Sequence, residues 1–275
     1  MNSILVPTDF SDTARNAGMY AVSLAQDLGI QKIILYNAYQ APISADPSMP
    51  AVQLFDIDVL KKSSKDGLEK FRSDLQSACN KPMLFETKAE FQLLTSGVEE
   101  LCKHGEIDAI VMGITGGNKV EEVLIGSNTI SVAKHVTVPV FVVPSGATYK
   151  PISKIVLACD FKKVVDTMPV NAIKNILDVT KAELHILNVS EKETKSVEQF
   201  ESLLLDTLFQ GYSPTYHFIH DTHFAEAINR FADENAIDLI ITIPKKHGLF
   251  EGLFRKSYTK ALAFHSHVPL MVIHE

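Results

Sequence analysis

The sequence predicts an α/β protein with two similar domains, each built on a parallel β-sheet that is covered by helices on both faces. Two observations support this prediction. Short apolar runs alternate with helical patterns along the chain, which is typical of parallel strands joined by helical crossovers. The pattern then restarts, because residues 154–161 resemble 3–10 and residues 267–273 resemble 137–143. A repeat this long indicates two tandem domains and not a solenoid unit.

The first half contains five expected strands, most of them short apolar runs typical of strands buried on both faces. They lie at residues 4–6, 33–36, 83–91, 109–112 and 139–143. Helices are expected between them, the first beginning at residue 12 or 13 and the others at about 52–78, 95–104 and 129–135. Ser11 or Asp12 can cap the first helix, and Gly29 ends it. Three prolines predict a loop over residues 40–50.

The second half repeats this order after a linker at residues 144–153, where proline, glycine and hydroxyl residues gather. Its strands are expected from residue 154 and at 184–189, 216–220, 239–243 and 267–273, and its helices at 172–179, 197–209 and 225–235. The expected domain boundaries are therefore 1–145 and 152–275.

Composition narrows the function classes. The chain of 275 residues carries a net charge of −7 and has no basic block, which argues against nucleic acid as a partner. No apolar run reaches the roughly 20 residues that span a bilayer, and the first strand starts without a signal segment. Cys79, Cys102 and Cys159 form no CxxC pair, so we expect reduced thiols in a cytoplasmic protein. Nothing in the sequence supports a redox-sensing thiol.

A glycine-rich stretch follows the strand at 109–112 and leads into the helix at 129–135. Its glycines are Gly113, Gly116 and Gly126, spaced by two and nine residues. Glycine lets a ligand approach the main chain closely, and a helix N-terminus offers free N–H groups to a phosphate. Ser127 and Thr129 add hydroxyl groups beside those amides. The stretch predicts a phosphate cradle, and the alternative is a surface loop that closes a βα unit.

The G-x2-G-x9-G-S spacing resembles the ATP-binding signature of the universal stress protein family. Residues 4–11 (Ile-Leu-Val-Pro-Thr-Asp-Phe-Ser) and 138–143 are similar to the first and last strands of that family. The resemblance implies two Rossmann-like domains of the adenine-nucleotide alpha-hydrolase-like type, each a five-stranded parallel sheet of order 3-2-1-4-5. Ligands of such sheets bind beyond the carboxyl ends of the strands, where the strand order reverses. Asp9 and Gly113 would then face one crevice.

The resemblance also implies a set of nucleotide-binding residues in the first half. It places the base near Pro7, Thr8, Asp9 and Ala38, the ribose and α-phosphate near Gly113, Thr115 and Gly116, and the other phosphates at Gly126, Ser127, Asn128 and Thr129. Gly117 is included among the nucleotide-binding residues without a separate role. Lys119 is a further candidate by its charge alone. The implied cofactor is ATP, with Mg²⁺ as an option. Asp9 is a candidate to accept a hydrogen bond from the nucleotide or to help hold Mg²⁺, and the sequence does not choose between these roles.

The second half keeps the acid but loses the glycines. Asp160 takes the place of Asp9, whereas Ile243, Lys246 and Lys256 stand where the first half has Gly113, Gly116 and Gly126. Side chains at these positions obstruct close approach to the backbone, so one nucleotide is expected per chain. The basic residues form either a solvated loop or a site for another anion.

Histidines in the second half invite a metal hypothesis that their spacing does not favour. His217, His220 and His223 are spaced by three, and residues three apart on a strand point to opposite faces. We therefore assign no metal site. We also assign no catalytic residue, because Asp9 is the one acid clearly placed at a strand tip of the first half and no histidine lies in its motif.

Three functions remain open. The favoured one is an ATP-binding stress-response module that signals through its nucleotide state. The alternatives are an ATP-hydrolysing or adenylyl-transferring enzyme on the same fold, and a scaffold in which the first site is empty as well. The two domains are expected to pair through their last strands as an intramolecular pseudo-dimer, because exposed apolar edges must be covered. A homodimer is compatible with the sequence.

Overall fold

The computed structural model describes residues 1–40, 56–114, 127–161, 164–191, 195–244 and 267–274. The first half contains the strands β1 (Ser3–Pro7), β2 (Lys32–Tyr39), β3 (Leu84–Phe91), β4 (Ala109–Ile114) and β5 (Val140–Pro144), and the helices α1 (Asp12–Leu28), α2 (Ile57–Ser77), α3 (Leu94–Lys103) and α4 (Ser127–His135). The second half contains the strands β6 (Lys154–Ala158), β7 (Glu183–Ser190), β8 (Thr215–His220), β9 (Leu239–Thr242) and β10 (Leu270–Val272), and the helices α5 (Val164–Thr167), α6 (Val170–Thr180), α7 (Lys195–Leu208) and α8 (Phe224–Glu234).

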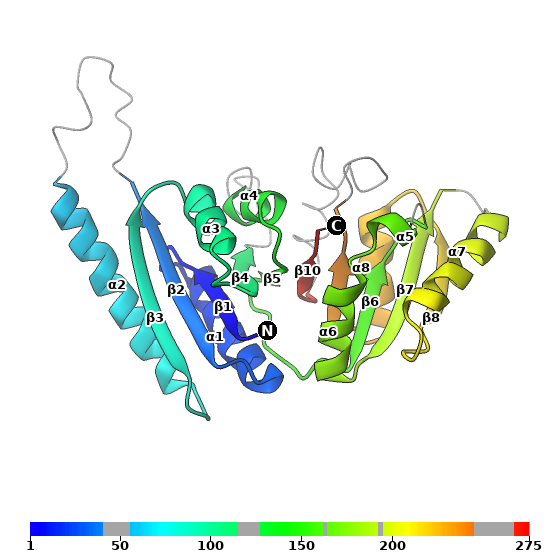
Figure 1. Cartoon of the computed structure of the whole chain (residues 1–275), viewed down its shortest axis with the longest axis horizontal. Coiled ribbons are helices and arrows are strands. Elements are labelled where there is room, and N and C mark those ends of the chain that lie inside the picture. Colours follow the sequence, from blue (N-terminus) through cyan, green and yellow to red (C-terminus); the bar gives the residue numbers. More distant parts are fainter. Residues whose placement is uncertain (41–55, 115–126, 162–163, 192–194, 245–266, 275) are drawn as a thin grey trace, which may run out of the picture.

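All of these strands belong to one sheet, in the order β3-β2-β1-β4-β5-β10-β9-β6-β7-β8. The strands within each half are parallel, and each half has the order 3-2-1-4-5 that the family resemblance implies. The halves meet where β5 and β10 pair antiparallel, with Val142 opposite Leu270 and Val140 opposite Val272. Figure 1 shows the two halves side by side with β5 and β10 at the centre. The expected contact between the last strands is therefore present.

Helices cover both faces of the sheet, which confirms the predicted fold class. One face packs against α1, α2, α6 and α7, and the other packs against α3, α4 and α8. Each of the two buried clusters contains residues from both halves, so the apolar core continues across the β5–β10 junction. No helix in the described part of the chain is both long enough and apolar enough to span a bilayer.

The local signals of α1 are those that the sequence predicts. The Ser11 side chain caps the helix by accepting a hydrogen bond from the Ala14 amide, and Gly29 ends it at φ 71°. The amino end of α2 differs from the prediction, because Asp56 caps a helix that begins at Ile57. The expected start of this helix at about residue 52 and most of the expected loop over residues 40–50 fall within residues 41–55, which lie outside the described part of the chain.

The second half departs from the predicted pattern after β6. The single helix expected at 172–179 is preceded by a short helix, α5, and Pro169 stands between α5 and α6. Proline lacks the N–H that would continue a helix, which explains the interruption. The helix that corresponds to α1 is therefore broken in this half.

A repeated carboxylate holds the first strand of each half at its amino end. The Oδ2 atom of Asp108, just before β4, accepts hydrogen bonds from the amides of Asn2 and Ser3. Asp238, just before β9, accepts them from the amides of Ser153 and Lys154 at 2.9 and 3.0 Å. The sequence analysis did not identify this pair, although Ile-Asp precedes the fourth strand in both halves.

The junction predicts a large effect for one core residue. Phe141 on β5 is fully buried and lies opposite Met271 of β10. Phe141→Ala should lower the free energy of unfolding by roughly 3–5 kcal/mol, because removing the ring leaves an empty space in the core that both halves share. Denaturant titration measures this effect. The control Phe200→Ala, on an exposed position of α7, should change the free energy by less than about 0.5 kcal/mol. Equal effects would contradict a shared core.

Candidate functional site

The strand order of the first half reverses between β1 and β4, and this is where the predicted site residues meet. The two strands are parallel neighbours, with Ile4 opposite Ala109. After β1 the chain enters α1 on one face of the sheet, and α4, the helix after β4, lies on the other face. The carboxyl ends of the two strands therefore lie between two helices, which is where sheets of this kind usually bind their ligands.

A tight turn presents Asp9 at this edge. The Thr8 side chain is buried and accepts a hydrogen bond from the Phe10 amide at 2.9 Å, and Asp9 accepts one from the Ser11 amide at 3.0 Å. Phe10 has a φ of 65°, a conformation that non-glycine residues seldom adopt. These bonds hold the turn, and the Asp9 side chain is left exposed.

A buried asparagine, missed in the sequence analysis, supports the turn from β2. Asn37 donates to the Thr8 carbonyl at 2.7 Å and accepts from the Ser64 hydroxyl of α2 at 2.6 Å. Buried amides are stable when their polar atoms are bonded in this way. The signal was available, because Asn188 occupies the matching place in the apolar strand β7.

Gly113 lies inside β4 and not in a loop, which corrects the predicted strand end at Met112. It pairs with Val143 of β5. A Cβ atom at this position would lie 2.5 Å from the carbonyl oxygen of Thr13 in α1. The described structure thus gives a packing reason for this glycine: the first turn of α1 lies directly against the end of β4.

A hydroxyl group ties the start of α4 to the same strand. Thr129, which is buried, donates a hydrogen bond from Oγ1 to the Gly113 carbonyl at 2.8 Å. The first turn of α4 is thereby fixed beside the end of β4. Free N–H groups at a helix start attract anions, so this placement suits a phosphate.

The other predicted residues divide into three groups. Pro7 is buried at the end of β1, and Ala38 is half-buried near the end of β2. Ser127 and Asn128 begin α4, and Asn128 is exposed. Five predicted residues lie outside the described part of the chain: Thr115, Gly116, Gly117, Lys119 and Gly126.

The second half builds the same frame but places different side chains at the ends of its strands. Asn188 donates to the Cys159 carbonyl at 2.9 Å, as Asn37 does to the Thr8 carbonyl. Phe161 has a positive φ of 51°, as Phe10 does in the first half. Asp160, however, is only 6% exposed, and Ile243, at the position of Gly113, is 3% exposed. Lys246 and Lys256 lie outside the described residues.

Comparison with known proteins identifies the family. The model of the "Universal stress protein family" matches residues 1–144 and 163–274, which is most of the chain. The chain belongs to the universal stress protein family. The sequence is 26% identical to a universal stress protein of Methanocaldococcus jannaschii over 144 residues, which cover 51% of this chain and 80% of that protein.

Solved structures support the tandem fold of this universal stress protein. The crystal structure of a universal stress protein from Archaeoglobus fulgidus aligns with a TM-score of 0.73 and 21% identity, and covers 100% of this chain and 96% of that chain. A protein of unknown function from Pseudomonas aeruginosa aligns with a TM-score of 0.57 and 13% identity, and covers 100% of this chain and 92% of that chain. Both alignments extend over the two halves.

The histidines of the second half form a pair that the sequence analysis did not foresee. His217 of β8 lies beside His185 of β7, with 3.0 Å between His185 Nδ1 and His217 Nε2. The ring of Phe231 in α8 packs against both. Among the described residues, no group of three or more histidine, cysteine or acidic side chains is arranged to hold a metal ion.

None of the three cysteines forms a disulfide within the described structure. Cys159 is buried, and burial raises the pKa of Cys102 to about 11, with a smaller contribution from the charge of Glu99. A thiol with a raised pKa stays protonated near neutral pH and reacts poorly as a nucleophile.

Gly113→Ala tests the packing reason for this glycine. The new Cβ must displace the backbone of Thr13, so the free energy of unfolding should fall by about 1–3 kcal/mol, measured by denaturant titration. Gly67→Ala is the matched control. Its Cβ would meet only the tip of the Phe10 ring, and the change should stay below about 1 kcal/mol because alanine favours a helix. Equal losses of unfolding free energy in the two variants would contradict the conclusion that the backbone of α1 requires a glycine at position 113.

The histidine pair predicts that stability falls in mild acid. Burial lowers the pKa of His185 and of His217, and the charges near His185 are Glu183, which raises its pKa, and Lys154, which lowers it. The unfolded chain therefore binds more protons than the native state below the ordinary histidine pKa, and stability is lost as the pH falls through that value.

Denaturant titrations at about pH 7.5 and about pH 5.5 bracket that pKa. His217→Gln should reduce the difference in unfolding free energy between the two conditions. The control His104→Gln, at an exposed position, should leave the difference unchanged. An unchanged difference in His217→Gln would contradict the assignment.

Proposed function

We propose that the protein binds one adenine nucleotide, ATP, in the crevice of its first half, and that it serves as a stress-response module whose state depends on that nucleotide. The observation that carries the proposal is the hydrogen bond from Thr129 to the Gly113 carbonyl. It holds the N-terminal turn of α4 at the end of β4, and β1 with its exposed Asp9 lies next to β4. A helix start beside a strand-order reversal suits a nucleotide phosphate.

The described residues fit the roles that the family resemblance implies. Ala38, which is half-buried, contributes apolar surface for the base, whereas the buried Pro7 shapes the end of β1. Asp9 is exposed and can accept a hydrogen bond from the nucleotide or help to hold Mg²⁺. Thr8 acts through the turn and not by contact, because its side chain is buried and its hydroxyl holds the Phe10 amide. Ser127, Asn128 and the amides of the first turn of α4 would hold the phosphates.

Lys119 and the four predicted residues at 115–117 and 126 complete this proposed site. They lie outside the described residues, so their part rests on the glycine spacing in the sequence. The bound nucleotide would supply negative charge and phosphate groups. The residues around it would supply the frame whose conformation depends on which nucleotide is bound. The described residues at the crevice support a binding module, and no acid–base pair among those described residues calls for a dedicated enzyme.

The difference between the halves supports one nucleotide per chain. Asp9 is exposed where Asp160 is buried, and the glycine at 113 is replaced by the buried side chain of Ile243. The second half therefore offers neither an exposed carboxylate after its first strand nor a glycine at the end of its fourth strand. We assign the binding domain to residues 1–145 and the domain with the degenerate motif to residues 152–275.

We further propose that the two domains form an intramolecular pseudo-dimer. The antiparallel pairing of β5 with β10 relates like strands of two like domains, as a two-fold axis does in a symmetric dimer. A single chain thereby keeps the paired arrangement while only one of its two sites binds nucleotide.

Calorimetric titration of the full chain with ATP and Mg²⁺ tests the proposal. The stoichiometry should be near one, and Gly126→Lys should abolish binding because the lysine side chain occupies the space of the phosphate. Ser73→Lys, at an exposed position of α2, is the control for charge. It lies near the carboxyl end of this helix, away from α4, and should bind ATP as the native protein does. A stoichiometry near two, or normal binding by Gly126→Lys, would overturn the assignment.

A further inference from the structure

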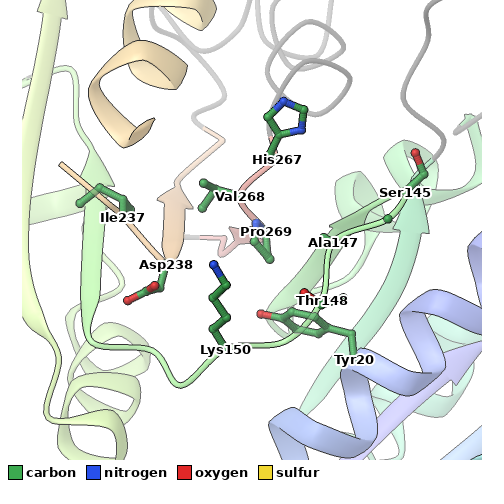
Figure 2. A pocket seen from close by; sticks show the side chains of 11 residues that line it. Tyr20, Ser145, Ala147, Thr148, Lys150, Ile237, Asp238, His267, Val268 and Pro269 are labelled. Carbon is green, nitrogen blue, oxygen red and sulfur yellow. The ribbon is translucent and has the colours of Figure 1, made fainter. Parts of the chain in front are cut away.

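A cavity of about 310 Å³ lies at the junction of the two halves, apart from the crevice of the first half. Its walls come from α1, from the linker after β5, and from the segments that precede β9 and β10. Figure 2 shows these segments around the cavity. Its volume is in the range of small-molecule sites. The cavity requires both halves, because neither half alone supplies all of its walls.

Tyr20 of α1 brings a hydroxyl group to this cavity. The residue is only 3% exposed, and its ring meets the ring of Tyr149 edge to face at 5.2 Å between centroids. Its hydroxyl has no hydrogen-bond partner within the described residues, and Figure 2 shows it directed toward Lys150. Burial, and to a lesser degree the charge of Asp238, raises the pKa of Tyr20, so the hydroxyl remains a donor near neutral pH. Because Tyr20 lines the cavity, its hydroxyl is available as a donor to an acceptor group bound there.

Lys150 of the linker supplies the positive charge. Figure 2 shows its side chain extending into the cavity, with the ammonium group near the centre. Within the described part of the chain it forms no ion pair. His267, at the rim, also has no hydrogen-bond partner there. The cavity thus offers the ammonium group of Lys150 and the neutral hydroxyl of Tyr20 to an acceptor group of a ligand.

Asp238 limits the charge of any ligand. Its Oδ2 atom accepts hydrogen bonds from both amides at the start of β6 and from the Ser153 hydroxyl at 2.7 Å. Figure 2 shows the carboxylate turned away from Lys150. The acid is therefore committed to the backbone, but its charge still opposes a second negative charge nearby. A ligand with one negative charge fits better than phosphate or a dicarboxylate.

The remaining wall is apolar. Val268 and Pro269, which lead into β10, and Ala147 of the linker contribute it. A ligand that carries an apolar body behind its charged group would bury that body against these side chains. This division of the cavity into a polar and an apolar part is usual for small-molecule sites.

We propose that the junction cavity binds a small organic monocarboxylate, with its carboxylate group at Lys150 Nζ and the Tyr20 hydroxyl and its apolar body against Val268 and Pro269. The ligand contacts both halves at once. It stabilises their junction and does so without occupying the crevice that we assign to the nucleotide.

Titration of the full chain with butyrate and with benzoate tests this proposal, with saturation-transfer NMR and calorimetry as readouts. We expect saturable binding of one molecule per chain, and weaker binding of inorganic phosphate. Tyr20→Phe and Lys150→Gln should each weaken binding about tenfold, because each removes one hydrogen bond to a charged group. Lys65→Gln, at an exposed position of α2, is the control for charge and should bind normally.

Tyr20→Phe keeps the ring and removes no hydrogen bond within the described structure, and Lys150 is exposed, so both variants should fold as the native protein does. Circular dichroism checks this. The proposal is overturned if neither carboxylate binds saturably, if both variants bind as tightly as the native protein, or if phosphate binds as tightly as the two carboxylates.

Discussion

The antiparallel pairing of β5 with β10 is the contact on which the rest of the architecture depends. A five-stranded parallel sheet leaves the strand at its edge with unpaired backbone groups and an apolar face. Here each half covers that edge of the other, and ten strands become one sheet. The cores on both faces continue through the junction, with Phe141 and Met271 at its centre. The junction cavity exists for the same reason, since its walls come from both halves.

Within each half, the frame of the crevice is built from the same bonds. An asparagine on the second strand holds the chain just after the first strand, and a residue with positive φ then turns it toward the next helix. Such a frame fixes where the acid at the strand tip lies. The halves differ in the exposure of that acid: Asp9 is exposed in the first half, whereas Asp160 is buried in the second. Duplication thus kept the frame and changed the site.

The helix after the first strand explains part of this difference. In the first half α1 is unbroken, and its first turn lies so close to β4 that a glycine is required at position 113. In the second half Pro169 separates α5 from α6, and Ile243 is buried at the matching position. A change at one strand end is therefore matched by a change in the helix that packs there.

The sequence by itself determined the fold class, the strand order through the family resemblance, the duplication and most element boundaries, because periodicity, caps and glycines act over a few residues. It also indicated Asp9, Gly113 and Thr129 as neighbours. Only the tertiary structure decided that Gly113 faces the backbone of Thr13, that His217 lies beside His185, and that Tyr20 and Lys150 share a cavity. These contacts join residues far apart in the chain, and their distances depend on how helices and strands pack, which no local pattern encodes.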